Sequence, residues 1–445
     1  MSEMETLAQI SQYVENHKKD FIEDWLQLVR MPSVSATGEG VAECCDWIVA
    51  KMKKLGISTV KRPLSPFPLI EGRCGSDPAK KTVLIYAHYD VKPAGDLSLW
   101  RTPPFEPTIS DGRVYARGSA DNKSPLMAHL EALSFYTKYV GALPVNLIFL
   151  FEGCEEEGSK GLADYLKKNR DRYKADLVFF SDGSKDPSGL PIIALGAKGV
   201  LGLTLKVRTL KKNVHSRYAP VLPNAAWRLV ELLNKLKTGD TVHIPGFYDG
   251  IIPPSKKELD ILKGLPDSSR QLEEMYGASV TLYGQKFYDR LNNTPTFNIS
   301  SITSGAAGVV PAAAEARIDV RLVAGQTPLD MEKKIKNYIS SLGYDDVEVL
   351  CEGGVEPSKT DINTPYLPVV EEATRAIYGN YVVYPCRPST APDYLWTNVL
   401  QLPAIQVRWS DADSDNHAPN EHLSIQEYLD GIRLTAYVIS KIAAQ

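Results

Sequence analysis

Short apolar runs bounded by polar loops alternate with helical patterns over the first 180 residues. The runs 82–86, 145–151 and 177–180 are continuously apolar, which is typical of strands in a sheet that is covered on both faces. Apolar residues at helical spacing mark 5–30 (with a break near His17 and Lys18), 40–55, 122–139 and 159–171. This alternation predicts an α/β domain with a mostly parallel, doubly wound sheet.

The pattern changes near residue 200. Strands are predicted at 201–207, 296–302, 314–323 and 346–351, and helices at 224–237, 268–275 and 328–342. Polar and apolar residues alternate between Glu315 and Arg321, which indicates a strand with one solvated face. The alternation of apolar strands and helices resumes after Pro357. It comprises a helix at 365–378, strands at 381–385 and 404–408, and a closing helix at 424–443. We therefore expect a smaller α+β unit, residues 200–355, inserted into a catalytic α/β domain built from residues 1–199 and 356–445.

The composition argues against a nucleic-acid-binding protein and against a membrane-spanning one. The chain has 445 residues, 43% of them hydrophobic, and a formal net charge of -4, so it has no basic excess for a nucleic-acid partner. Charges interrupt every long apolar run, which argues against a membrane span. Six cysteines without a CxxC pair indicate reduced thiols, and the polar N-terminal stretch has no signal pattern. We expect a cytoplasmic protein without a membrane partner.

Side chains that can bind metals follow each of the three predicted parallel strands. They are His88 and Asp90, the run Glu155–Glu157, and Asp182. Asp121 stands at the start of a predicted helix, and His417 lies in an acidic loop before the last helix. In open α/β sheets, ligands bind outside the carboxyl ends of the strands, so these side chains are candidates for one shared site.

Two histidines and several carboxylates without cysteine indicate a zinc or manganese site rather than a structural finger. Two neighbouring metals need a bridging carboxylate, which Asp121 could supply. The site also needs a carboxylate that is not a ligand, to take the proton of the bound water. The adjacent Glu155 and Glu156 suit that division of roles. Asp90 could accept the second imidazole N–H of His88 and orient the ring.

Each candidate also has a simpler interpretation when it is taken alone. Asp121 could be a helix N-cap, the run Glu155–Glu157 a solvated helix start, and Asp182 a turn residue. His88 could be a packed histidine, and His417 an exposed one. The presence of all five features in one chain favours the metal site.

At these positions the chain resembles the carnosinase-like dipeptidases. Their wider clan includes glutamate carboxypeptidase, acetylornithine deacetylase, succinyl-diaminopimelate desuccinylase and aminoacylase. The resemblance is carried by residues 86–93, 100–105, 111–123 and 152–159, and it extends in order over nearly the whole chain. Tyr89, Trp100 and the run Pro103–Phe105 favour the dipeptidase branch over the deacylases.

The resemblance implies a role for each candidate. His88 and Asp182 would bind one metal ion, Glu156 and His417 the other, and Asp121 would bridge them. Glu155 would be the general base and Asp90 the residue that orients His88. Two divalent ions per subunit are implied, zinc first, with manganese or cobalt as alternatives.

The resemblance also implies that residues 200–355 form a lid through which two subunits dimerise. His215 would stabilise the oxyanion in the partner subunit's site, although taken alone it could simply end a strand. Arg321 would grip the substrate carboxylate, a task that suits a guanidinium, or it could belong to the exposed face of its strand. Ser389 and Thr390 lie where the family places a small hydroxyl near the substrate.

The chain departs from the family pattern at several positions near the substrate. The differing segments are Ser124–Pro125, His215–Arg217, Gly308 and Arg387–Thr390. All five metal positions are intact. We therefore predict a metal-dependent peptidase that acts on dipeptides or short peptides with a free C-terminal carboxylate. The alternatives are a deacylase of N-acyl amino acids and, more remotely, a non-catalytic assembly protein.

Overall fold

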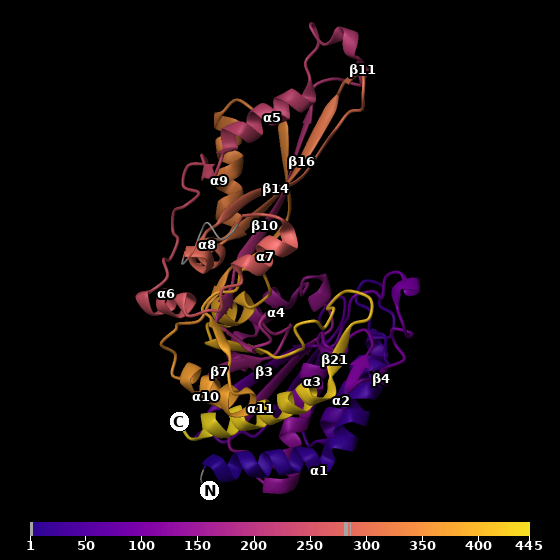
Figure 1. Ribbon diagram of the computed structural model, residues 1–445, viewed down its shortest axis with the longest axis vertical. Coiled ribbons are helices and arrows are strands. Elements are labelled where there is room, and N and C mark those ends of the chain that lie inside the picture. The colour runs from indigo at the N-terminus through magenta and orange to yellow at the C-terminus, as the bar shows by residue number, and fades with distance from the viewer. Residues whose placement is uncertain (1–2, 280–283, 285) are drawn as a thin grey trace.

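An eight-stranded mixed sheet forms the centre of the larger body of the molecule (Figure 1). The structure is a computed structural model and describes residues 3–279, 284 and 286–445. The strand order is β1-β2-β6-β3-β7-β20-β8-β19. The strands are β1 (Ser58–Arg62), β2 (Leu69–Cys74), β3 (Thr82–His88), β6 (Asn146–Glu152), β7 (Leu177–Phe180), β8 (Ile192–Ala194), β19 (Val382–Tyr384) and β20 (Ala404–Arg408). The pairs β6–β3, β3–β7, β7–β20 and β8–β19 are parallel, and the other three pairs are antiparallel.

Helices cover both faces of this sheet, as the continuous apolar strands predict. One face packs against α1 (Glu3–Val29), α2 (Val41–Lys54), α3 (Lys123–Ser134), α10 (Tyr366–Tyr378) and α11 (Ile425–Ala443). The other face packs against α4 (Leu162–Lys168) and a π-helical segment, Leu395–Leu400. Successive residues of β3 alternate between the two cores: Val83 and Ile85 enter the first, and Leu84 and Tyr86 the second. This is why residues 83–87 of the strand form an unbroken apolar run.

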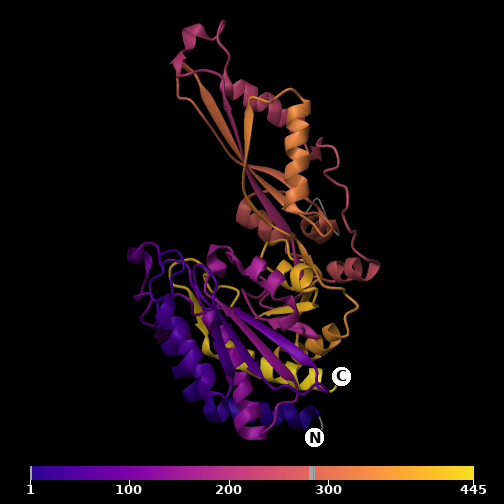
Figure 2. The ribbon, with the colours of Figure 1, turned by 180° about the vertical axis from the view of Figure 1, so that it is seen from behind.

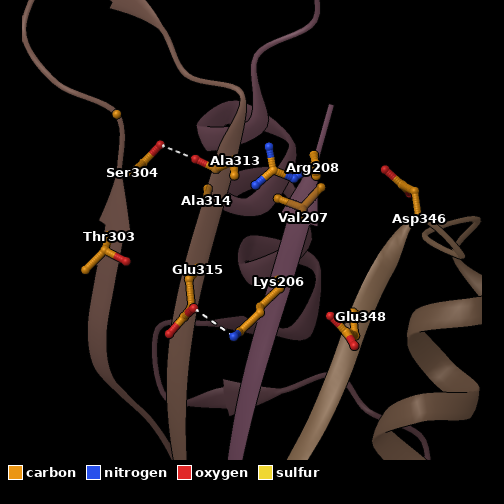
Figure 3. A pocket seen from close by; sticks show the side chains of 11 residues that line it. Lys206, Val207, Arg208, Thr303, Ser304, Ala313, Ala314, Glu315, Asp346 and Glu348 are labelled. Atoms are coloured by element: carbon orange, nitrogen blue, oxygen red, sulfur yellow. Dashed lines mark hydrogen bonds and ion pairs between the residues drawn. The ribbon is translucent and has the colours of Figure 1, made fainter. Parts of the chain in front are cut away.

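A four-stranded antiparallel sheet forms the smaller body, which extends away from the first (Figures 1 and 2). Its order is β14 (Thr296–Ser304), β16 (Ala313–Leu322), β10 (Gly199–Arg208) and β17 (Val347–Val355). Helices α5 (Ala225–Leu236) and α9 (Pro328–Ser341) pack on one face. The opposite face is open and charged, with Lys206 paired to Glu315 at 3.3 Å beside a groove of about 800 Å³ (Figure 3).

The remaining elements are short. They are β4 (Thr108–Ser110), β5 (Arg113–Tyr115), β9 (Gly196–Ala197), β11 (Val214–His215), β12 (Lys237–Thr238), β13 (Thr241–Val242), β15 (Val309–Val310), β18 (Ser358–Lys359), β21 (His422–Ser424), α6 (Lys256–Lys263), α7 (Ser269–Tyr276) and α8 (Phe287–Asn293). Within the described part of the chain, no helix is long and apolar enough to cross a membrane.

The prediction of a break in the first helix was wrong, because α1 runs without interruption. His17 packs between Tyr13 and Phe21, with ring centroids 4.2 and 5.9 Å away. One of its ring nitrogens lies 2.9 Å from the Tyr13 carbonyl oxygen, one helical turn earlier. The polar pair at 17–18 therefore belongs to the helix surface and does not end the helix.

Candidate metal centre

Three neighbouring strands bring the predicted ligands to one edge of the large sheet. β3 lies between β6 and β7 and is parallel to both, so the three carboxyl ends adjoin. His88 is the last residue of β3 and is fully buried. Glu155 and Glu156 lie in a single 3₁₀ turn after β6, and Asp182 follows β7 by two residues. The metal-binding types of side chain that follow β3, β6 and β7 in the sequence thus lie together at one edge of the sheet.

Asp121 lies between the two histidines. Its Oδ1 is 3.1 Å from His88 Nε2, and its Oδ2 is 3.1 Å from His417 Nε2. The N-cap of α3 is Asn122, so Asp121 does not take the capping position that was its simpler interpretation. Because each carboxylate oxygen faces a different histidine, Asp121 has the geometry of a bridging ligand.

Two groups of metal-binding side chains share Asp121. His88, Asp121 and Asp182 form one group, and Asp121, Glu156 and His417 form the other. Within each group, one ligand atom per residue lies within 4.8 Å of the others. His417 Nε2 is 3.1 Å from Glu156 Oε2. Two histidines and three carboxylates in two adjoining sets fit a pair of divalent ions.

The carboxyl groups of the site crowd one another. Burial and the neighbouring Asp121 raise the pKa of Asp182 to about 7. Burial raises the pKa of Glu155 well above its usual value, in spite of the opposing effect of His88. Ionising both carboxyl groups is therefore unfavourable without a cation, and a bound cation would favour their charged forms.

Hydrogen bonding to carboxylates favours the charged form of both histidines. Asp121 and Glu156 raise the pKa of His417 to about 10. Burial alone would lower the pKa of His88, but Asp121 and Asp90 outweigh it and raise that pKa. The same contacts with His417 and His88 overcome burial and lower the pKa of Asp121. Bound cations would take the place of these imidazolium charges.

Asp90 supports both His88 and the turn that carries the glutamates. Its Oδ1 accepts the backbone N–H of Glu155 and its Oδ2 that of Glu156, both at 3.1 Å. The nearest acceptor for His88 Nδ1 is the Asp90 backbone carbonyl, at 3.1 Å, and Asp90 Oδ1 lies at 3.4 Å. Asp90 therefore contacts the histidine mainly through its backbone carbonyl, and its carboxylate holds the adjacent glutamate turn.

The comparisons with known proteins agree with this arrangement. A family model described as Peptidase family M20/M25/M40 matches residues 84–441, which include all five candidate ligands. The chain belongs to this peptidase family. It is therefore a peptidase-type hydrolase, and the fold and family expected from the sequence are confirmed.

Relatives within the M20 family match over nearly the full length. The chain is 28% identical to the Cys-Gly metallodipeptidase dug1 of Schizosaccharomyces pombe, over 99% of both proteins. It is 24% identical to the human Beta-Ala-His dipeptidase, over 98% of this chain and 93% of the relative. Among solved structures, the M20 family metallo-carboxypeptidase Sso-CP2 of Sulfolobus solfataricus matches with a TM-score of 0.87 and 32% identity, covering 96% of this chain and 99% of that one.

Two of the three predicted substrate-binding residues meet across the two bodies of this M20 protein. Arg321, on β16, donates a hydrogen bond from Nη1 to Thr390 Oγ1 at 2.9 Å and lies 3.1 Å from Asp319. Ser389 is exposed beside Thr390. The contact between Arg321 and Thr390 joins the segment 200–355 to the segment that completes the large sheet.

His215 lies far from the metal-ligand candidates of its own chain. It is exposed and belongs to β11, which pairs with β15 at the remote end of the smaller body (Figures 1 and 2). Its Nδ1 accepts the backbone N–H of Arg217 at 3.1 Å. Within one chain, therefore, the structure does not bring His215 to the site.

Glu421 is a residue of the site whose role the sequence did not reveal. It is fully buried, and its two oxygens accept backbone N–H groups from Gly118, Ala120 and Asp121 at 2.9 to 3.0 Å. It also accepts a hydrogen bond from Arg117 at 2.7 Å. Glu421 follows His417 by four residues in the same acidic loop, and this nearness to a candidate ligand was the signal in the sequence that could have pointed to it.

Proposed function

We propose that this protein is a two-metal dipeptidase that acts on dipeptides and short peptides with a free C-terminal carboxylate. The observation that carries the proposal is the pair of ligand sets that share Asp121, with Glu155 beside them. The names of the full-length relatives, a Cys-Gly metallodipeptidase and a Beta-Ala-His dipeptidase, support this substrate class.

The ligand roles follow from the two sets. His88 and Asp182 would hold one ion, Glu156 and His417 the other, and Asp121 would bridge them. Such ions would act as Lewis acids and would lower the pKa of a bound water toward about 7. Zinc suits a set of histidines and carboxylates, and manganese or cobalt can bind the same ligands.

Glu155 is placed to act as the general base. Its Oε2 is 4.0 Å from His88 Nε2, and its side chain is largely buried and belongs to neither ligand set. From this position the carboxylate would take the proton of the attacking water and then deliver it to the leaving amine. Asp90 fixes Glu155 for this task through its backbone N–H.

Residues 200–355 would serve as a lid and a dimerisation unit, with residues 1–199 and 356–445 as the catalytic domain. His215 would act in the site of a partner subunit, which fits its exposed position far from the ligands of its own chain. There it would donate a hydrogen bond to the oxyanion, an interaction typically worth about 3–4 kcal/mol per donor. Arg321, Ser389 and Thr390 would bind the substrate near its carboxylate.

A hydrolysis screen tests the proposal. The metal-free protein is reloaded separately with zinc, manganese or cobalt and given dipeptides, N-blocked longer peptides, and N-acetyl and N-succinyl amino acids. We expect cleavage of the dipeptides with a free carboxylate. Cleavage of the N-blocked longer peptides as well would make the enzyme a carboxypeptidase, as the name of the Sulfolobus relative suggests. Activity on acyl amino acids alone would overturn the dipeptidase proposal in favour of a deacylase.

A further inference from the structure

Arg408 ends β20 beside the metal-ligand candidate Asp182. β20 is parallel to β7, with Gln406 opposite Phe180 and Ser410 bridged to Ser184, so Arg408 stands opposite Asp182 at the same edge of the sheet. The guanidinium also approaches the backbone after Asp182 closely. A Cβ built on Gly183 would lie 2.5 Å from an Arg408 Nη atom, so any other residue there would force the guanidinium to shift.

The Arg408 side chain has no partner within the chain as described. Its Nε is buried without a hydrogen bond, and no carboxylate of the described residues forms an ion pair with it. Nearby, Arg387 is paired with Asp393 at 2.6 Å, and both residues are buried. Asp393 is therefore already paired with Arg387 and forms no ion pair with Arg408.

An unpaired guanidinium in this position is costly. Burial and repulsion from Arg387 lower the pKa of Arg408 to about 10, although Asp182 partly opposes them. Groups that are desolvated and unpaired are stabilised when a ligand of opposite charge binds. A carboxylate fits best, because a guanidinium binds its two oxygens with two parallel hydrogen bonds.

We propose that Arg408 binds a carboxylate of the substrate next to the scissile bond. Arg321, the residue expected to grip the carboxylate, already contacts Asp319 and Thr390, whereas Arg408 is unpaired. The carboxylate is either the C-terminus of the substrate or an acidic side chain of its last residue. This inference rests on the proposed peptidase function and adds a second carboxylate-binding group to the one proposed there.

The test compares R408Q, R408K and the wild type on four substrates: Ala-Ala, Ala-Ala amide, Ala-Glu and Ala-Gln, the amide being assayed as a competitive inhibitor if it is not cleaved. R30Q is the matched control, since Arg30 is half exposed and pairs only with Glu23, at 3.4 Å. A hydrogen bond to a charged group contributes about 1.5–3 kcal/mol. R408Q should therefore raise KM about 10- to 100-fold for the substrates that carry the carboxylate bound by Arg408. The change in kcat should be small, and R408K should recover part of the loss.

The pattern of losses identifies the carboxylate. If Arg408 binds the C-terminus, R408Q weakens Ala-Ala, Ala-Glu and Ala-Gln equally and leaves the amide unchanged. If it binds an acidic side chain, only Ala-Glu is affected. Equal losses on all four compounds, or no loss on any, would overturn the proposal, because a purely structural role does not distinguish the substrates.

Two further measurements keep the outcome clear. Metal content and melting temperature are compared between variants, and if R408Q does not fold, R408K carries the same four-substrate comparison. If the metal-loaded wild type cleaves none of the dipeptides, the proposed function fails, and calorimetric titration with glutarate then tests Arg408 alone. Binding at least about tenfold weaker in the variant supports the carboxylate site, and equal binding rejects it.

Discussion

The Glu421 carboxylate accepts a hydrogen bond from the backbone N–H of Asp121 at 3.0 Å, across 300 positions of the sequence. Through this contact, the loop that carries His417 fixes the loop that carries the proposed bridging ligand. Asp415, His417 and Asn420 all have left-handed backbone angles, with φ of 53°, 64° and 69°. Such conformations are unfavourable for residues other than glycine and persist only where surrounding contacts hold them.

Replacing Glu421 with glutamine should weaken metal binding. The glutamine has the same shape, but its NH₂ group meets backbone N–H donors and leaves Arg117 without its charged partner. Residues that support metal ligands typically contribute about 10- to 100-fold in affinity, and breaking a buried ion pair costs about 3–5 kcal/mol. Calorimetric zinc titration and the melting temperature of the metal-free protein measure the two effects.

The exposed variant E23Q is the control for this experiment, since Glu23 lies on α1 far from the site. It should change neither quantity by more than a few tenths of a kcal/mol. Unchanged zinc affinity in E421Q would show that Glu421 does not position Asp121.

Glu155 should be required for catalysis and not for metal binding. E155Q removes the group that accepts the proton of the water but leaves both ligand sets intact. General-base catalysis contributes about 10²- to 10⁴-fold, so kcat should fall by that amount while two metal ions per subunit remain. Steady-state rates and metal analysis on the same sample measure both.

The neighbouring Glu157 supplies a matched control. It lies in the same 3₁₀ turn but points to Lys92 and Lys160, each 3.9 Å away. E157Q should keep most of the activity. If E155Q also kept it with full metal content, another group would have to be the base.

The candidate ligands could be picked out from the sequence because the physical causes are local. A strand buried on both faces is apolar at every position, so the ligands after β3, β6 and β7 stand out in the sequence. Glu421 did not stand out, because it acts on backbone N–H groups that carry no sequence signal. Arg408 was hidden because only the pairing of β20 with β7 places it beside Asp182.

The exposed edge of the large sheet was not predicted, for a related reason. β1 has only exposed and half-buried positions, and four of its five residues are charged or polar, so it lacks an apolar run. Its partner β2 contains Glu71, which is buried among arginines and breaks the apolar pattern of that strand. Long-range ion pairs of this kind become visible only once the strands are paired.

Glu71 should make stability depend on pH below about 4.5. Burial alone would raise its pKa, but hydrogen bonds from Arg62, Arg73 and Tyr173 lower it to about 2. The unfolded chain therefore binds a proton more readily than the folded protein, so the contribution is complete above about 4.5 and is lost as the pH falls to 2. A shift of this size corresponds to about 3 kcal/mol.

Chemical denaturation at several pH values measures this effect. E71Q should have a lower free energy of unfolding at pH 7 and a shallower decline between pH 4.5 and 2 than the wild type. The control D171N removes a highly exposed carboxylate and should leave the slope unchanged. Parallel pH curves for E71Q and the wild type would show that Glu71 is not the titrating group.

His215 should act in the site of a partner subunit. Neither E155Q nor H215A should be active alone, the first for want of its base and the second for want of its oxyanion donor. In a mixed dimer, one site combines the intact Glu155 of the H215A chain with the intact His215 of the E155Q chain. Random mixing of equal amounts should therefore restore roughly a quarter of the wild-type activity, since half the dimers are mixed and each has one complete site.

Subunit exchange followed by a rate assay measures the recovery. The H243A variant is the control, because His243 is also exposed in the smaller body and has no proposed role. Mixing E155Q with H243A should give activity from the H243A dimers as well, so its recovery should exceed that of the E155Q and H215A mixture. His215 lies so far from the candidate ligands of its own chain that it can reach a site only in a partner subunit. If the mixture of E155Q and H215A recovers no activity although light scattering shows dimers, His215 takes no part in the reaction.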